Sequence, residues 1–143
     1  MGLLDKKQLL TKEKLEIVKV DLGNNEFVYV TQMTGRERDR FERSLMRETK
    51  DAKGKTLGYE QALDDFRAKL AVVTLCDQDG NMLLDPKDVS VLSQSMSAVR
   101  LEKIANAAQK INAITEEDKE ALVKNSEVGL ADNSNSDSAE SLV

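Results

Sequence analysis

The chain has 143 residues, a mass of 15.9 kDa, a formal net charge of −5 and 33% charged residues, enough for one well-solvated domain with one core. The acidic balance argues against a general nucleic-acid binder, because such a protein needs a basic face to displace counterions. The lack of histidine removes the commonest general base and zinc ligand, and a single cysteine suits a reducing cytoplasm. No stretch is apolar enough for a signal peptide or a membrane span, so we expect an intracellular protein that does not bind a membrane. We also expect it to use no metal and no cofactor.

The first predicted elements are an N-terminal arm and a β-hairpin. Residues 1–13 are expected to form an arm or a short helix with four leucines (Leu3, Leu4, Leu9 and Leu10). The apolar residues then alternate with a period of two in LEIVKVDL (15–22) and in EFVYVTQM (26–33), which are rich in β-branched and aromatic residues. Gly23-Asn24-Asn25 can adopt the positive φ angles of a tight turn, so the two runs predict an antiparallel hairpin.

Two helices are predicted next. Thr34-Gly35-Arg36-Glu37 is a capping box, and a helix should run from it to about Lys50 with Phe41 and Leu45 on its apolar stripe. The segment DAKGKTLG (51–58) is a polar linker with two glycines. The strongest helical period follows, and it predicts a central core helix with the stripe Tyr59, Leu63, Phe66, Leu70 and Val73.

The segment LCDQDGN (75–81) resembles the start of a calcium-binding loop. Such a loop needs glycine at its sixth position and a bidentate glutamate at its twelfth, but counting from Asp77 these positions hold Met82 and Asp88. Asp79-Gly80 is instead a strong signal for a two-residue type I′ turn. The sequence therefore predicts a structural turn at Asp79, Gly80 and Asn81 and no metal site.

Helix-start signals continue to residue 125. Asp85-Pro86 is expected to begin a helix whose Val89 and Leu92 face inward. Ser95 or Ser97 can cap the next helix, whose stripe is Leu101, Ile104, Ala108 and Ile111. Thr115 to Asp118 makes a weaker box before a short helix ending near Lys124. The predicted fold is a single α+β domain (14–125), in which the hairpin packs against four to five helices, followed by a disordered acidic Ser/Asn/Asp-rich tail (126–143).

No catalytic arrangement is visible in the sequence. Serine and cysteine nucleophiles normally need a histidine base, and the chain has none. The phosphate-binding motifs GxxxxGK[ST] and GxGxxG do not occur either. The acidic pairs Asp64-Asp65 and Glu116-Glu117 are expected on helices, where neighbouring side chains point about 100° apart. Cys76 follows an apolar stripe and is expected to be a small buried hydrophobe. We therefore expect a protein that is not an enzyme.

The densest charge cluster is GRERDRFER (35–43). Its arginines suggest RNA binding, but the interleaved acidic residues favour pairing along an exposed helix. If this helix has a function, we expect it to bind a protein partner through Arg36, Arg40, Phe41, Leu45 and Met46. In the alternative, Phe41 and Leu45 only pack on the hairpin.

The order of these elements resembles a known family. A hairpin leads into TGRERDRF, then YEQALDDFRAKLAVVTLCDQDGNMLLDPKDVSVLSQ, then MSAVRLEKIANAAQKINAITEEDKE. Over residues 14–125 this pattern is similar to the tail assembly chaperones of long-tailed bacteriophages and prophages, particularly the XkdN-like group. The acidic turn, the Asp-led helix and LEKIANAAQKIN carry most of the resemblance.

The resemblance implies a non-catalytic function in the cytoplasm of a bacterial host. Proteins of this family coat the tape measure protein and recruit the major tail (tube) protein, and self-association is possible. Their genes often carry a programmed frameshift. Val123-Lys124-Asn125 could be encoded GUA AAA AAC, a slippery sequence, so residues 126–143 would belong to the unshifted product. The alternatives are a structural tail or baseplate component retained in the virion, and a small regulatory or RNA-binding protein.

Overall fold

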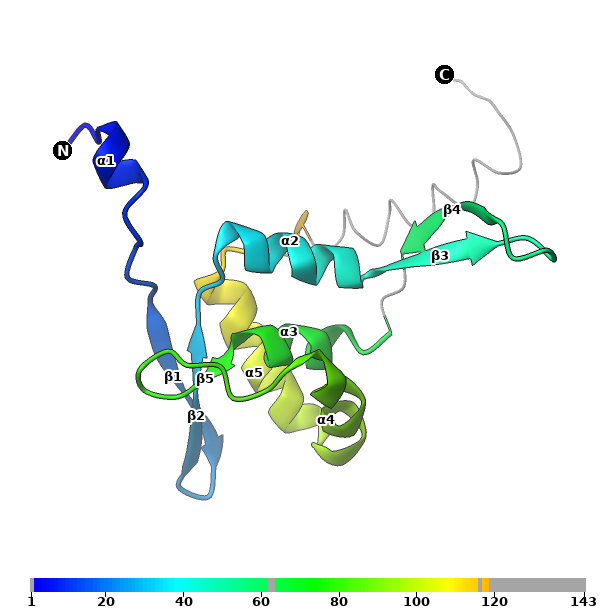
Figure 1. Cartoon of the computed structure of the whole chain (residues 1–143). Helices are drawn as coiled ribbons and strands as arrows, with labels where there is room; N and C mark the ends of the chain where they lie inside the picture. The colour runs from blue at the N-terminus through cyan, green and yellow to red at the C-terminus, as the bar shows by residue number, and fades with distance from the viewer. Residues whose placement is uncertain (1, 62–63, 116, 119–143) are drawn as a thin grey trace.

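The computed structural model describes residues 2–61, 64–115 and 117–118. Over these residues the chain forms a mixed α+β fold in which a hairpin packs against helices, as predicted (Figure 1). Its elements in chain order are α1 (Lys6–Leu9), β1 (Ile17–Gly23), β2 (Glu26–Thr31), α2 (Gly35–Ser44), β3 (Met46–Lys50), β4 (Thr56–Gln61), α3 (Phe66–Thr74), β5 (Leu75–Cys76), the 3₁₀ helix η1 (Pro86–Asp88), α4 (Val89–Ser95) and α5 (Ala98–Ile111).

The predicted first hairpin is confirmed. Strands β1 and β2 pair antiparallel from Ile17 opposite Thr31 to Gly23 opposite Glu26, and the short strand β5 extends the sheet in the order β1-β2-β5. Asn24 and Asn25 connect the strands with φ angles of 56° and 62°. Two successive positive φ angles are the signature of a type I′ turn, whose twist matches that of the strands.

One face of this sheet meets helices α3 and α5. Val20 and Leu22 of β1 and Val30 of β2 are buried on that face. The stripe predicted for α5 faces the same core, because Leu101, Ile104 and Ala108 are buried and Ile111 packs against them. The inward positions predicted for Val89 and Leu92 of α4 and for Leu70 of α3 are likewise confirmed. The core is almost wholly aliphatic, in keeping with the scarcity of aromatic residues.

The helix predicted from Thr34 to Lys50 is shorter than expected. Its capping box is present, since Thr34 Oγ1 accepts from the Glu37 N–H (3.2 Å) and Glu37 Oε1 accepts from the Thr34 N–H (2.8 Å). The helix ends at Ser44, however, and residues 46–50 form strand β3. Cross-strand pairing with β4 replaces helical hydrogen bonds along one edge of this segment, so the hairpin overrides its helix propensity.

The helix predicted to begin at Tyr59 starts at Phe66 instead. Tyr59 lies in strand β4 and is exposed, and Leu63 lies outside the described residues. Asp65, directly before α3, has a φ angle of +59°, which is outside the right-handed helical region. The predicted polar linker is also shorter, because Asp51 Oδ1 accepts from the N–H groups of Lys53 and Lys55 (both 2.9 Å) and closes a turn between β3 and β4.

The predicted turn at Asp79, Gly80 and Asn81 is confirmed, but its type is not I′. Gly80 has a φ angle of +86°, whereas Asp79 is not among the positive-φ residues. The Gly80 N–H donates to the Asp77 carbonyl (3.0 Å) and the Asp77 N–H donates to the Asn81 carbonyl (2.9 Å). This is the three-residue loop in which an ordinary turn is followed by a left-handed glycine. A Cβ at Gly80 would lie 3.4 Å from Ile17 Cδ1, so the turn folds closely over β1.

The remaining predicted helix starts are partly confirmed. Asp85 Oδ1 accepts from the Lys87 N–H (3.0 Å) before the 3₁₀ turn that leads into α4. Ser97, rather than Ser95, caps α5. Thr115 and Asp118 exchange two hydrogen bonds, both 3.0 Å. The helix expected to reach Lys124, the Val123-Lys124-Asn125 site and the predicted tail (126–143) lie outside the described residues.

None of the helices in the described part of the chain combines the length and apolar character that crossing a bilayer requires.

Candidate binding groove

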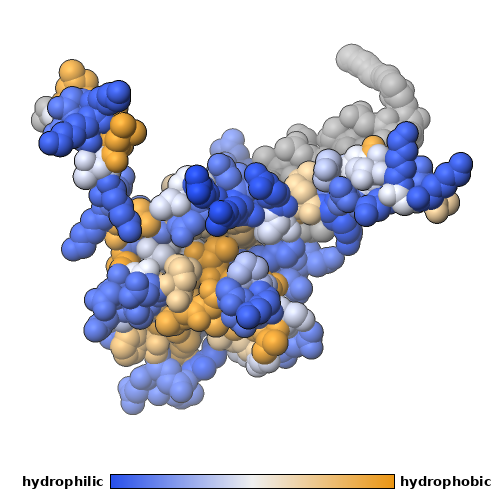
Figure 2. Space-filling model, viewed as in Figure 1, coloured by the Kyte–Doolittle hydropathy of each residue, from blue (hydrophilic) through white to orange (hydrophobic). Residues whose placement is uncertain are grey.

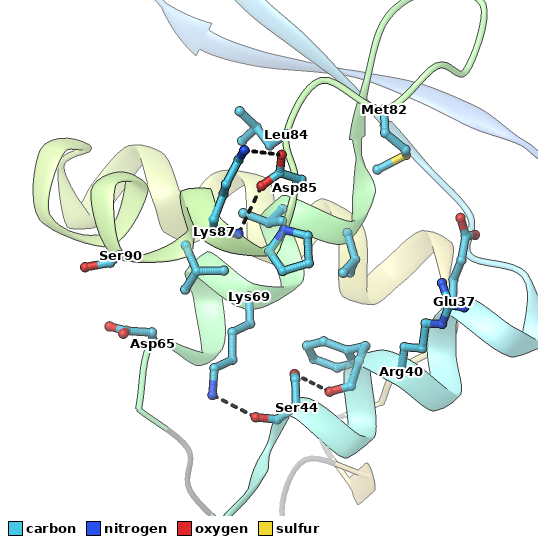
Figure 3. A pocket seen from close by; sticks show the side chains of 15 residues that line it. Glu37, Arg40, Ser44, Asp65, Lys69, Met82, Leu84, Asp85, Lys87 and Ser90 are labelled. Carbon is cyan, nitrogen blue, oxygen red and sulfur yellow. Dashed lines mark hydrogen bonds and ion pairs between the residues drawn. The ribbon is translucent and has the colours of Figure 1, made fainter.

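An open groove of about 570 Å³ lies between α2 and the segment from Met82 to Ser90 (Figure 3). Helix α3 forms its floor with Val72 and Val73. The other apolar side chains that line it are Phe41 from α2 and Met82, Leu84, Pro86 and Val89 from the segment facing α2. In Figure 2 an apolar area is visible near the centre of this face, with hydrophilic side chains around it. Volume and lining fall in the range of natural binding sites.

The polar lining of the groove consists of two serines (Ser44 and Ser90) and of three acidic and three basic side chains, most of which have partners. Lys69 Nζ donates to the Ser44 carbonyl (2.9 Å) and Lys87 Nζ lies 3.9 Å from Asp85 Oδ2 (Figure 3). Asp65 Oδ1 accepts from Ser93 Oγ (2.6 Å), and Glu37 belongs to the capping box of α2. Arg40 has no hydrogen bond or ion pair within the described residues, so its guanidinium is free to meet an anion on a partner.

The five residues expected to bind a partner are separated by the fold. Arg40 lines the groove, whereas Arg36, one turn earlier on α2, is exposed outside it. Phe41 and Leu45 are 3% and 1% exposed, so they do not form an open stripe on α2, although Phe41 also lines the groove. They lie in the core, and Phe41 packs edge-to-face on Phe66 with the ring centroids 5.7 Å apart. Met46 is exposed on β3, away from the residues that line the groove.

The charge pairing expected along α2 is present but reaches further than the helix. Arg38 Nε lies 3.5 Å from Glu42 Oε2. Arg38 Nη1 also donates to the Asn112 carbonyl (2.9 Å) at the end of α5. Asn112 in turn accepts from the Met33 N–H (2.6 Å) and donates to the Ala108 carbonyl (2.9 Å). These bonds tie α2 and the end of β2 to α5, and they give this arginine a structural role.

The aspartate-rich turn uses its carboxylate internally. Asp77 Oδ1 accepts from the N–H groups of Asp79 (2.8 Å) and Asn81 (3.0 Å), and Asp77 Oδ2 accepts from Asn81 Nδ2 (3.2 Å). These bonds, above all that from the Asn81 N–H, lower the pKa of Asp77. Across the described residues, no group of three or more Cys, Asp or Glu side chains is placed to hold a metal ion.

The other titratable candidates also have structural surroundings. Cys76 is buried, as predicted, and burial followed by the nearby charge of Asp77 raises the pKa of its thiol. Asp64 lies 3.7 Å from Arg47, while Asp65 accepts from Ser93, so the two neighbouring carboxylates do not converge. Glu116 lies outside the described residues.

Most of the groove was not predicted from sequence. Val73 and Val89 were assigned to apolar stripes, but nothing in their spacing indicated that a side of the core would stay open. Met82, Leu84 and Pro86 line the groove only because the turn at Gly80 brings the chain back over α3. The only usable signal was the apolar run at 82–84 beside the Asp-Pro helix start.

Comparison of the chain with protein-family models, with curated proteins and with solved structures finds no match.

Proposed function

We propose that this protein is a non-catalytic tail assembly chaperone of a long-tailed bacteriophage or prophage. In this proposal it acts in the cytoplasm of the bacterial host, covers apolar segments of the tape measure protein and recruits tail tube subunits. Two things support the proposal: the resemblance of residues 14–125 to that family, and the open apolar groove with charged edges. The groove is the observation that carries it.

The groove suits an amphipathic helix better than a small polar substrate. Its floor is aliphatic, its walls carry further apolar side chains including Phe41, and α2 and the Met82–Ser90 segment border it on two sides. A helix that lies in such a groove inserts side chains spaced three and four residues apart. Arg40 at the edge would meet an acidic residue next to that apolar stripe. A long helical client presents many such stripes, so many copies of a small acidic domain can cover it and keep it soluble.

Binding to peptides that tile the helical region of the tape measure protein tests the proposal. We expect Met82→Lys to weaken binding by about tenfold or more, because a charge would enter an apolar contact. Leu83→Lys is the matched control, since Leu83 is the next residue, is also exposed and does not line the groove. Arg40→Ala should weaken binding by about threefold, while Arg36→Ala should have no effect.

Two outcomes would contradict the proposal. One is that no tape measure peptide binds the folded protein. The other is that mass spectrometry of purified particles finds the chain in stoichiometric amounts, because a chaperone leaves the tail whereas a tail or baseplate component stays in it.

A further inference from the structure

Four exposed cationic side chains on α2 and the β3–β4 hairpin, termed here the cationic strip, have no partner. They are Arg36 and Arg43 on α2, and Lys53 and Lys55 in the turn between β3 and β4. None of these side chains has a hydrogen bond or an ion pair among the residues that the structure describes. Arg36 and Arg43 are seven residues apart and therefore share one face of the helix, whereas Arg40 lines the groove.

The strip lies in a basic region of an acidic chain. Residues 35–61 carry eight basic and six acidic side chains, a net charge of +2, whereas the whole chain carries −5. Most of these acidic side chains already have partners, in the capping box of α2, in ion pairs or in the turn before β4. Asp39 has none in the described part of the chain. An anionic partner would therefore meet cations that are not yet neutralised.

The hairpin next to the strip also has an uncovered apolar face. Glu48 pairs with Tyr59 and is two residues from Met46, so Met46 and Tyr59 lie on the same face of the ribbon. These two side chains are 41% and 66% exposed. Figure 1 shows the ribbon projecting from the end of α2. A two-stranded ribbon is marginally stable by itself, so a segment that covers this face would stabilise it.

Another part of the same chain has the matching chemistry. Residues 126–143, termed here the acidic segment, contain four acidic side chains and no lysine or arginine, a net charge of −4. Near its start, Val128 and Leu130 follow Glu127 and precede Asp132. Apolar side chains with acidic neighbours are the complement of an apolar face with cationic neighbours. The acidic segment itself lies outside the described residues.

The described chain stops close to α2. Arg38 Nη1 on this helix donates to the Asn112 carbonyl (2.9 Å), directly after α5. Hydrogen bonds from Thr115, followed by the charge of Arg38, lower the pKa of Asp118, so this last described residue also lies near α2. Residues 119–125 connect it to the acidic segment, and seven extended residues span at most about 25 Å, roughly twice the diameter of a helix. The segment therefore begins within reach of the outer face of α2.

We propose that the acidic segment of each chain binds the cationic strip of that same chain. Its apolar residues cover the exposed face of the β3–β4 hairpin, and the acidic residues on either side of them meet the cations of the strip. Each exposed ion pair is weak, but the tether raises the effective concentration to the millimolar range. A contact with a dissociation constant of about 1 mM is then formed about half of the time. The inference does not rest on the proposed function, because it uses neither the groove nor a client.

Two other occupants of the strip fit less well. A strand of RNA would also meet the cations, but the net charge of −5 repels it. The acidic segment of a second copy has the same chemistry but lacks the advantage of the tether. Each of these occupants gives a different result in the experiments below.

Paramagnetic relaxation enhancement tests the contact in the full chain. A nitroxide is attached at Ser136→Cys, and Cys76 should react poorly because it is buried and its thiol pKa is raised. At low salt we expect broadened amide signals in α2 and in β3–β4, and unchanged signals at the turn between β1 and β2. At about 0.5 M salt the broadening should fall by about threefold or more. Signals of β3–β4 that are unaffected at low salt would overturn the proposal.

Charge reversal identifies the surface to which the segment binds. Arg43→Glu and Lys53→Glu should each reduce the broadening in β3–β4 by about twofold or more. Lys103→Glu, at an exposed position on α5, is the matched control and should leave it unchanged. An equal loss in all three variants would mean that the segment follows the net charge of the chain and not the strip, which contradicts the proposal.

Isotope mixing separates binding within a chain from binding between copies. A spin-labelled chain without ¹⁵N is mixed with an unlabelled ¹⁵N chain, and we expect no broadening of the ¹⁵N signals. If β3–β4 is broadened in this mixture, the segment binds a second copy and the proposal fails. If oligouridine RNA displaces the segment from the intact chain at physiological salt, the strip is a nucleic-acid site and the assignment is also wrong.

Amide exchange measures what the contact does for the hairpin. The full chain with its four acidic side chains neutralised carries Glu127→Gln, Asp132→Asn, Asp137→Asn and Glu140→Gln. In this variant, exchange in β3 and β4 should accelerate by about twofold, because a contact formed half of the time is lost, while exchange in β1 and β2 stays the same. Ser134→Ala with Ser138→Ala is the control within the segment and should have no effect. Unchanged exchange in the neutralised chain would show that the segment does not cover the hairpin.

Discussion

The β1–β2 hairpin and the β3–β4 hairpin have similar lengths, but the first packs on the core and the second is exposed to solvent. The first lies on α3 and α5, and its inward-facing side chains are buried. The second projects from the end of α2, and its apolar side chains Met46, Leu57 and Tyr59 are exposed (Figure 1). What holds the second hairpin together is backbone pairing and polar contacts such as Arg47 to Glu60 (3.1 Å). Two-stranded ribbons of this kind are marginally stable in water, so the two hairpins should differ widely in local stability.

The largest expected difference comes from the same substitution in each hairpin. Leu22→Ala in β1 should lower the free energy of unfolding by about 2–5 kcal/mol, because a buried side chain leaves a cavity. Leu57→Ala in β4 should change it by less than about 0.5 kcal/mol, because Leu57 is 68% exposed. Urea unfolding followed by circular dichroism measures both. Equal effects would mean that the β3–β4 hairpin is covered in solution.

Asn112→Ala should lower the free energy of unfolding, because the Asn112 side chain joins the chain after β2 to helix α5. It leaves the Met33 N–H without its acceptor, which should cost about 1–3 kcal/mol. Asn106→Ala, at an exposed position on the same helix, is the matched control and should be neutral or slightly stabilising. Indistinguishable unfolding curves for the two variants would show that the bonds of Asn112 contribute nothing measurable.

Turn substitutions compare how strongly each hairpin is coupled to global unfolding. Asn25→Val places a β-branched residue at a φ angle of 62° and should cost about 1 kcal/mol of global stability. Gly54→Val introduces comparable strain at a φ angle of 83° in the β3–β4 turn. There we expect faster amide exchange in β3 and β4 with an unchanged unfolding midpoint. A shifted midpoint for Gly54→Val would show that both hairpins unfold as one unit.

The smallest expected effect is the pH dependence of the turn that packs on β1. Folding lowers the pKa of Asp77 below its ordinary 3.8, so the ionised carboxylate stabilises the protein above that pH. The stability difference between wild type and Asp77→Asn should therefore be present at pH 6 and shrink as the pH falls through the native pKa. Asp79→Asn is the control, since the Asp79 carboxylate accepts none of these bonds. A difference that stays constant from pH 6 to pH 3 would contradict this role.

Sequence reasoning succeeded where a local pattern and its burial agree. The period of two in residues 15–33, the box at Thr34 and Glu37, and the stripe of α5 all appear in the structure. It failed between residues 45 and 65, where the spacing predicts helices that include Met46 and Tyr59 but the structure has strands β3 and β4. An exposed ribbon has no buried face, so its strands carry no apolar alternation, and its polar residues have helix propensities too weak to decide the matter.

The candidate binding residues also fall into those that the sequence predicts and those that it does not. The sequence names Arg40 as a possible contact residue. Whether its guanidinium is unpaired depends on which ion pairs the neighbouring charged residues form in the folded protein. Phe41 and Leu45 could not be told from an exposed stripe, because an apolar face has the same spacing whether it is covered by a partner or by its own domain.

The sequence alone therefore determined the α+β class, the first hairpin, several helix starts, the position of the 79–81 turn and the lack of a histidine-based active site. These follow from backbone preferences and side-chain chemistry that act over a few residues. Only the tertiary structure decided where α2 ends, that residues 46–61 form a second hairpin, and that a groove stays open above α3. The end of α2 and the groove depend on which distant segments pack together, and no short stretch of the chain encodes the free energy of such contacts. The second hairpin depends on pairing between β3 and β4, which no apolar alternation marks in the sequence.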